Sequence, residues 1–156
     1  MRTNERTMRD IIVRRAREDE SDAVAALFRL SKETAMPYLP NLHTPEEDRA
    51  YVRERVFADC EVWLAERDDE IVGLIAFRTG WIDQLYAHPA HQRSGIGTAL
   101  LQKAKDANDR LQLWAFQRNE SARRFYESQG FRVERTTDGG YNVEREPDLL
   151  YVWTRR

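Results

Sequence analysis

Short runs rich in Ile, Val and aromatic residues alternate along the chain with segments in which apolar residues recur every three or four positions. The first pattern is typical of strands and the second of amphipathic helices. Strands are predicted over residues 11–16, 62–66, 71–77, 81–87, 111–116, from 131 onward, and over 149–153. Helices are predicted from Asp19 or Ser21 to before Pro37, and over 44–57, 95–107 and 120–129.

The order of these elements indicates a mixed sheet. The runs 62–66 and 71–77 flank the turn Asp68-Asp69, so they are expected to form an antiparallel hairpin. From residue 81 onward strands and helices alternate, which implies a parallel pair of strands. The expected fold class is therefore α/β, with a central, mostly antiparallel sheet flanked by about four helices. Residues 136–147 are expected to form a surface loop before the last strand.

Length and charge narrow the class of protein. The chain has 156 residues, close to the roughly 150 of one domain, so a flexible tail over 1–9 and a single domain over 10–156 are expected. The formal charge of -2 gives no basic field for nucleic acid or a membrane surface. No apolar run approaches the roughly 18 residues of a membrane span, and no secretory segment precedes the first strand. A cytoplasmic location is expected.

Metal chemistry is not expected. The chain has one cysteine and three scattered histidines, whose spacing is not typical of zinc, and one cysteine makes no internal disulfide. These residues are Cys60, His43, His88 and His91.

The segment 88–98 carries two glycines, Gly95 and Gly97, at the predicted start of a helix. Such a start leaves several backbone N–H groups unpaired and unshielded by side chains, and the helix dipole adds to their pull on an anion. The side chains that add a charge and two hydroxyls, as a pyrophosphate site requires, are Arg93, Ser94 and Thr98. The alternative is a tight connection eased by glycine, with no ligand.

Two common phosphate-binding loops do not fit this segment. A Walker loop needs Lys-Ser or Lys-Thr after its last glycine, but Gly97 is followed by Thr98-Ala99. A dinucleotide fingerprint needs a third glycine at position 100, which is Leu100. Nucleotide triphosphate hydrolysis and a nicotinamide cofactor are therefore disfavoured.

The segments Gln92–Gly97 and Asn119–Phe131 carry two motifs that resemble those of the GCN5-related N-acetyltransferases (the GNAT superfamily). Gln92-Arg-Ser-Gly-Ile-Gly97 is similar to the loop with which that family cradles the pyrophosphate of acetyl-coenzyme A. Asn119-Glu-Ser-Ala-Arg-Arg-Phe-Tyr-Glu-Ser-Gln-Gly-Phe131 resembles the second coenzyme motif, at the family's order and spacing. The resemblance covers about residues 60–135 and implies acetyl-CoA as co-substrate, with no metal.

The resemblance also implies which residues bind the coenzyme. In the family the fourth strand carries a bulge and splays from the fifth, so that the pantetheine arm pairs with it like an added strand. The main chain of Leu85 and Ala87 corresponds to that edge. The phosphates would be held by Gln92, Arg93, Ser94, Gly95, Ile96, Gly97 and Thr98. Asn119 would contact the coenzyme near the pantetheine, although Asn there is also a good helix cap.

Two residues are candidates for catalysis. Tyr126 matches the tyrosine that faces the leaving thiolate in the family; because a tyrosine has a pKa of about 10 and a thiol about 8.5, a hydrogen bond is favoured over full proton transfer. Asp83 is the carboxylate on the fourth strand and, by period two, shares a face with Leu85 and Ala87. It is expected to be the general base, a structural acceptor or salt-bridge partner, or a solvated carboxylate at the sheet edge. Many relatives place a glutamate nearer position 81, which here is Trp81.

The expected reaction is acetyl transfer to a primary amine, of a small molecule or an amino acid, by direct nucleophilic attack. Residues placed to line the acceptor pocket are Tyr38, His43 and Tyr51, and the acidic segment 137–148 is either a solvated surface or a weak attraction for a cation. The alternative function is a non-catalytic acyl-CoA-binding sensor. A homodimer through an exposed last strand with Tyr151 and Trp153 is a further expectation.

Overall fold

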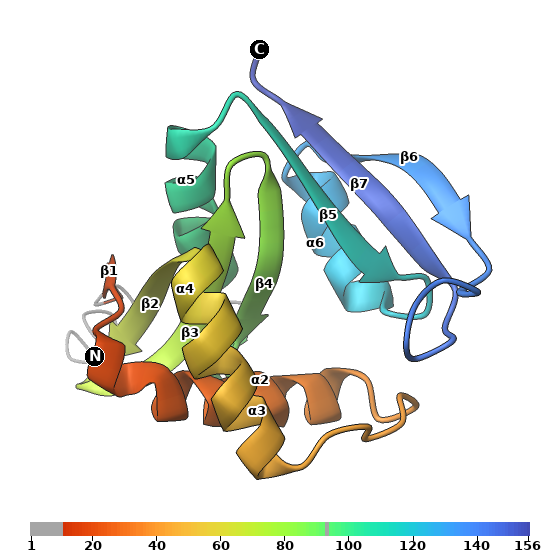
Figure 1. The fold of residues 1–156 in the computed structure, drawn as a ribbon. Helices are drawn as coiled ribbons and strands as arrows, with labels where there is room; N and C mark the ends of the chain where they lie inside the picture. The colour runs from red at the N-terminus through yellow and green to blue at the C-terminus, as the bar shows by residue number, and fades with distance from the viewer. Residues whose placement is uncertain (1–10, 93) are drawn as a thin grey trace.

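The computed structural model describes residues 11–92 and 94–156, and within them seven strands form one sheet in the order β1-β2-β3-β4-β5-β7-β6 (Figure 1). The strands are β1 (Ile12–Arg15), β2 (Glu61–Arg67), β3 (Glu70–Arg78), β4 (Trp81–Ala87), β5 (Arg110–Phe116), β6 (Arg132–Thr137) and β7 (Asp148–Thr154). Neighbours are antiparallel except β4 and β5, which are parallel. The predicted mixed α/β class is confirmed. The predicted tail over residues 1–9 lies outside the described residues.

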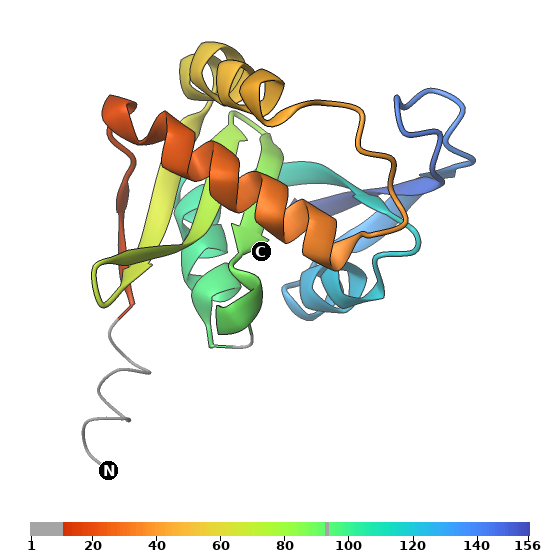
Figure 2. The same ribbon diagram turned by 90° about the horizontal axis from the view of Figure 1, so that it is seen from below.

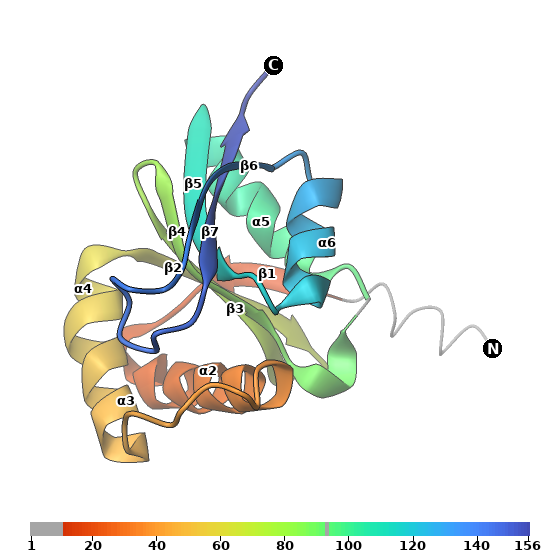
Figure 3. The ribbon, with the colours of Figure 1, turned by 90° about the vertical axis from the view of Figure 1, so that its right-hand side faces the viewer.

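Helices cover both faces of this sheet (Figure 3). The helical segments are η1 (Glu18–Glu20), α2 (Ser21–Ala35), α3 (Pro45–Tyr51), η2 (Val52–Val56), α4 (Phe57–Asp59), η3 (Pro89–His91), α5 (Ile96–Ala107) and α6 (Glu120–Ser128). Helices α2 to α4 lie on one side of the sheet and α5 and α6 on the other. Figure 2 shows α2 crossing the sheet diagonally. No helix in the described ranges has the length and apolar character needed to cross a membrane.

Local signals in the sequence explain several element boundaries. Asp68 and Asp69 have φ values of 51° and 65°, which suit the tight hairpin turn between β2 and β3. The Thr44 hydroxyl accepts from the Glu47 N–H (3.1 Å), and the Glu47 carboxylate accepts from the Thr44 N–H (2.9 Å). A capping box is therefore present at the start of α3. The helix predicted over 44–57 contains a π-helical turn, closed by a bond from Phe57 N–H to the Val52 carbonyl.

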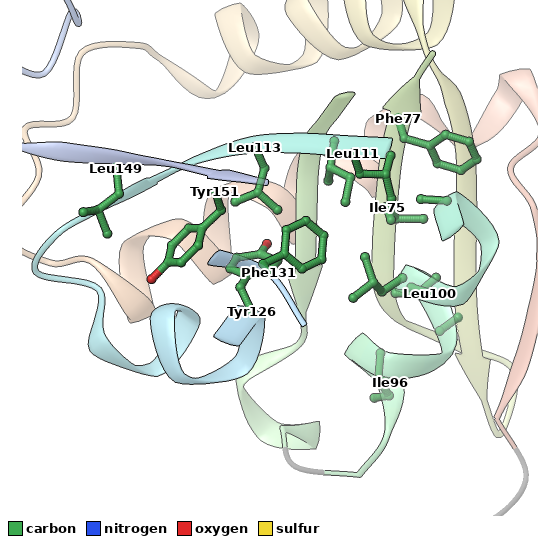
Figure 4. Close-up of a cluster of buried hydrophobic side chains, with 14 of the residues drawn as sticks. Ile75, Phe77, Ile96, Leu100, Leu111, Leu113, Tyr126, Phe131, Leu149 and Tyr151 are labelled. Atoms are coloured by element: carbon green, nitrogen blue, oxygen red, sulfur yellow. The ribbon is translucent and has the colours of Figure 1, made fainter. Parts of the chain in front are cut away.

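Each face of the sheet packs its own hydrophobic core. The core beneath α5 and α6 contains aromatic side chains from the C-terminal half, among them Tyr126, Phe131 and Tyr151 (Figure 4). The core beneath α2 and α3 is aliphatic, with Leu64 and Leu74 fully buried.

The sheet opens between its fourth and fifth strands. Within the described residues, β4 and β5 share one pair, Trp81 with Gln112, supported by a bond from Gln112 N–H to the Gly80 carbonyl (2.9 Å). Below that pair the two strands diverge, and the gap widens toward the ends of β4 and β5 (Figure 1). The predicted splay between these strands is confirmed.

The last strand is not an edge of the sheet. Strand β7 lies between β5 and β6 and pairs with both, because β6 turns back to form the outer strand. Tyr151 is completely buried, and Trp153 is half-buried. The expectation that these residues lie on an exposed strand is therefore wrong. A homodimer stays a prediction, but it no longer rests on an exposed last strand.

Candidate active site

The glycine loop ends in a helix start with open amides. Gly95 has φ of +84°, a left-handed conformation that favours glycine, and α5 begins at the next residue. The first main-chain bond of the helix runs from Ala99 N–H to the Gly95 carbonyl (3.0 Å). No main-chain carbonyl in the described part of the chain accepts from the N–H groups of residues 96–98. The helix therefore presents three donors and the positive end of its dipole to an anion.

Two glycines bring this helix close to its neighbours. A Cβ on Gly97 would lie 3.1 Å from the ring of Phe125, so this glycine lets α5 approach α6. A Cβ on Gly73 would lie 2.5 Å from the Cγ2 atom of Ile96, so this glycine lets the start of α5 rest on β3. The sequence analysis did not single out Gly73, although a glycine inside a strand is a sign of close approach.

The side chains of the loop contribute less than its main chain. The Ser94 hydroxyl donates to the His91 carbonyl, and the Thr98 hydroxyl accepts from the Gln129 side chain (3.2 Å). Gln92 is exposed. Arg93, a predicted phosphate ligand, lies outside the described residues. The described hydroxyls thus hold the loop's shape, and the amides of residues 96–98 face outward.

Strand β4 offers its main chain to the gap. His88 N–H bonds to the Val72 carbonyl (2.8 Å), and Tyr86 is paired with Leu74, so the even-numbered residues of this part of β4 bond to β3. Main-chain groups alternate in direction along a strand, so those of Leu85 and Ala87 point toward β5. The side chains of these two residues pack against the core beneath α5. The sequence analysis expected both features.

Tyr126 contributes its ring to the core. Its ring centroid lies 5.3 Å from that of Phe125 and 5.5 Å from that of Phe131. Burial raises the pKa of Tyr126 above its ordinary value, and the nearby Tyr86 hydroxyl raises this pKa further. Tyr126 is therefore a weaker acid than a free tyrosine, which favours donating a hydrogen bond to a thiolate over transferring the proton.

Asn119 caps α6. Its side-chain oxygen accepts from Ala122 N–H (3.2 Å), as expected for a capping asparagine. Because this oxygen is engaged, the side-chain NH₂ group is the part of Asn119 that remains to contact a ligand.

Asp83 lies on the opposite face from Leu85 and Ala87, so the placement by period two is wrong. Opposite β4, Ala76 pairs with Gln84 but Phe77 pairs with Ile82, which leaves Asp83 as the extra residue of a bulge. The bulge turns Asp83 toward α3 and α4. Asp83 Oδ2 accepts there from Arg78 Nε (2.9 Å) and Cys60 Sγ (3.3 Å).

The Cys60 thiol beside Asp83 is a neutral donor. Burial, and then the hydrogen bond to Asp83, raise the pKa of Cys60 to about 12. The hollow that contains this pair is lined by Tyr51, Arg55, Val56, Asp59, Cys60, Arg78 and Asp83. In the described ranges, no three His, Cys, Asp or Glu side chains are grouped so as to hold a metal ion.

The other side of the gap is built by segments distant in sequence. Tyr86 projects from β4 toward α2, where its ring meets Phe28 edge-on at 5.5 Å. Burial raises the pKa of Tyr86, with smaller contributions from Glu144 and Tyr51, so the carboxylate and both tyrosines are close enough to interact electrostatically. The sequence analysis expected Tyr51 but missed Tyr86 and Glu144. The alternation of residues along β4 was the signal for Tyr86. The signal for Glu144 was the acidic segment 137–148, which the fold brings close to β4.

The segment 137–148 is a structured loop whose acids are largely engaged. Glu146 binds Arg118 through both carboxylate oxygens (2.7 and 2.8 Å), and Asp148 accepts from the Thr137 hydroxyl. Arg118 also stacks on the Tyr38 ring, 4.0 Å from its centroid. Tyr38 therefore supports the loop from the α2–α3 connection. His43 lies farther along that connection and lines a separate hollow beside α2.

Known proteins are similar to this chain in sequence and in fold. A family model described as an acetyltransferase (GNAT) domain matches residues 58–133. An uncharacterized N-acetyltransferase of Archaeoglobus fulgidus is 35% identical over 124 residues, covering 63% of this chain and 83% of that protein. The peptidyl-lysine N-acetyltransferase YiaC of Escherichia coli is 27% identical over 123 residues, covering 78% of this chain and 84% of that protein.

The fold likeness extends over nearly the whole chain. The structure of YncA from Salmonella typhimurium with its cofactor acetyl-CoA has a TM-score of 0.70 and 16% identity, and covers 94% of this chain and 95% of that one. The open edge of β4, the glycine loop and the capped α6 follow one another along this chain, in the order that the two motifs predict. The chain belongs to the GNAT superfamily of acetyl-CoA-dependent N-acetyltransferases.

Proposed function

We propose that this protein transfers the acetyl group of acetyl-CoA to a primary amine on an aliphatic stem, by direct attack of the amine. The observation that carries the proposal is the open edge of β4. Along this edge the main chain of Leu85 and Ala87 faces away from β3, and the start of α5 rests on Gly73, the residue that pairs with Ala87.

The residues present suit the coenzyme. The N–H groups of residues 96–98 would hold the pyrophosphate, with Gln92, Ser94 and Gly95 shaping the loop around it. The main chain of Leu85 and Ala87 would pair with the pantetheine arm as an added strand. The side-chain NH₂ of Asn119 would donate to the same arm. The coenzyme supplies an acetyl group activated as a thioester.

Tyr126 would donate a hydrogen bond to the departing sulfur. Its raised pKa keeps the hydroxyl protonated over the whole working range of pH, so it acts as a fixed donor. Asp83 has the salt-bridge role, since Arg78 and Cys60 both occupy one of its oxygens. An amine that reaches the gap already neutral needs no dedicated base, and kcat/KM then rises toward the amine pKa of about 10.

The acceptor class follows from the relatives more than from the sequence. The sequence alone favoured a small molecule or an amino acid. The relatives named as peptidyl-lysine N-acetyltransferases, at 27% and 29% identity, favour the side-chain amine of lysine. A lysine side chain satisfies both, as the free amino acid or within a peptide.

A thiol-release assay tests this function. Purified protein is mixed with acetyl-CoA and one acceptor from a panel of free lysine, a lysine-containing peptide, a polyamine and an aminoglycoside. Release of coenzyme A that depends on the lysine compounds, with the acetyl group found on the ε-nitrogen by mass spectrometry, is the expected result. Binding of acetyl-CoA with no acceptor-dependent thiol would favour the sensor alternative instead.

A further inference from the structure

Lys32 and Glu144 form an ion pair between helix α2 and the loop that follows β6. Lys32 lies in the last turn of α2 and Glu144 in the loop between β6 and β7, and 3.8 Å separates Nζ from Oε2. Their side chains are 27% and 20% exposed. A charge-assisted hydrogen bond is about 2.7–2.9 Å long, so this carboxylate attracts the ammonium without a close hydrogen bond.

An aromatic wall flanks the pair. Lys32 Nζ lies 5.7 Å from the centroid of the Phe28 ring, within the range of a cation–π contact. The Phe28 ring in turn packs against Tyr86 on β4. Glu144 raises the pKa of Tyr86, and Tyr86 raises that of Tyr126, so these three side chains lie close enough to interact electrostatically.

Glu144 differs from the other acids of this side. Both oxygens of Glu146 bind Arg118, Asp148 accepts from Thr137, and Asp83 accepts from Arg78. No hydrogen bond to Glu144 is formed by any described residue. This carboxylate is therefore available to a second cation.

We propose that Glu144 binds the ammonium of the acceptor and that Lys32 occupies the same position when no acceptor is bound. The proposal rests on the proposed function and specifies its acceptor. The ligand is a primary ammonium on an unbranched aliphatic stem, with the stem against Phe28, which is the chemistry of Lys32 itself. An entering ammonium displaces Lys32 toward solvent and hydrogen-bonds the carboxylate; it then gives its proton to solvent, and the neutral amine attacks the thioester.

Equilibrium binding tests this assignment without turnover. Calorimetry of protein saturated with coenzyme A measures the affinity for Nα-acetyl-lysine amide and for Nα-acetyl-norleucine amide, which lacks the ammonium. The parent protein is expected to bind the lysine probe more tightly. Glu144→Gln weakens that binding about fivefold, to the level of the norleucine probe, because a partly exposed ion pair contributes at most about 1 kcal/mol.

Removing the charge of Lys32 is expected to have the opposite effect on binding of the lysine probe. Lys32→Met removes the internal competitor and is expected to tighten binding of the lysine probe about threefold, with no change for norleucine. In the double variant Lys32→Met/Glu144→Gln the gain disappears. Weaker or unchanged lysine binding in Lys32→Met, or unchanged binding in Glu144→Gln, would overturn the proposal.

Controls separate this proposal from loss of fold and from the proposed function. Lys103 also lies over an aromatic ring, 4.6 Å from the centroid of Trp63, but on the α5 side, so Lys103→Met should leave lysine binding unchanged. Glu134→Gln is the matched acid control. Unchanged affinity for coenzyme A shows that each variant is folded. If the probes bind as expected but no acetyl group is transferred, only the proposed function is contradicted. If acetyl is transferred but the KM for the acceptor is the same in the parent and in the Lys32 and Glu144 variants, only this inference is contradicted.

Discussion

The two faces of the sheet bury different kinds of side chain. Beneath α5 and α6 the buried residues are aliphatic and aromatic, and Gly73 and Gly97 let α5 pack closely against β3 and α6. In the described part of the chain, four of the five buried polar residues belong instead to η1, α2 and α3 on the other face: Glu20, Ser21, Ser31 and Asp48. Arg14 and Arg29 pair with two of these acids at 2.6 and 2.7 Å.

This difference fits the division of the site that we propose for the two ligands. Fixed main-chain donors at closely packed glycines suit a coenzyme that does not vary. The acceptor differs between proteins, and charged side chains on loops and helix ends change without disturbing the coenzyme side. The α5 face should therefore be sensitive to side-chain volume and the α2 face to charge.

The largest expected effect comes from Gly73→Ala. The added methyl meets Ile96 and the Tyr86 carbonyl, so either α5 or β4 must shift. Overpacking of this kind costs about 1–3 kcal/mol of stability, and the displaced amides should weaken coenzyme A binding about tenfold. Urea unfolding and calorimetry measure the two effects.

Gly80→Ala is the matched control for that substitution. A Cβ at Gly80 meets nothing within 4 Å, although its φ of +79° disfavours alanine. It should lose stability through backbone strain but keep its affinity for coenzyme A. If Gly73→Ala also keeps that affinity, close packing of α5 on β3 does not position the phosphate site.

Glu20→Gln tests the charge dependence of the α2 face. Arg14, followed by the Arg17 N–H, lowers the pKa of Glu20 from 4.5 to about 2. A lowered folded-state pKa stabilises the protein above pH 4.5, and that stability is lost as the pH falls from 4.5 toward 2. We expect Glu20→Gln to be about 2 kcal/mol less stable at pH 7 and less dependent on pH across that window.

Urea unfolding at a series of pH values measures this difference. The exposed acid Glu54, which lies 3.7 Å from Arg53, supplies the control, and Glu54→Gln should change stability by less than about 0.5 kcal/mol. Parallel pH profiles for the parent and Glu20→Gln would show that the Arg14 pair does not stabilise this face.

Tyr126→Phe separates packing from chemistry on the α5 face. The ring contacts survive, so the melting temperature should change little, whereas kcat should fall about tenfold with the loss of one hydrogen bond to the leaving sulfur. Tyr151→Phe reverses the pattern. It removes a hydroxyl that donates to Glu127 (2.7 Å), so it should lose about 1 kcal/mol of stability with kcat unchanged. Equal kcat for the parent and Tyr126→Phe would remove the catalytic role.

Asp83→Asn is expected to have the smallest effect. The carboxylate pairs with Arg78 in a partly exposed position, so kcat/KM should stay within about twofold of the parent and keep its alkaline rise. A large drop in kcat/KM together with a flat alkaline limb would identify Asp83 as the general base after all.

The features that the sequence determined by itself are local. The capping box at Thr44, the hairpin turn at Asp68-Asp69, the cap at Asn119 and the glycine loop each depend on residues within a few positions of one another. Steric limits on φ and short-range hydrogen bonds decide such features, so a motif read along the chain is enough. The family resemblance rested on two of these features, the glycine loop and the segment that begins at Asn119.

Tertiary structure alone decided how these pieces meet. A one-residue bulge, which no periodicity shows, moved Asp83 to the other face of the sheet. The pairing of β7 with both β5 and β6 buried Tyr151. The pairs Lys32–Glu144 and Arg118–Glu146 join segments far apart in sequence, because the fold brings the loop between β6 and β7 beside the end of α2 and the start of α6. Such contacts depend on the register and closure of the whole sheet, so the motifs of the proposed coenzyme side were visible in the sequence, whereas the contacts of the proposed acceptor side were not.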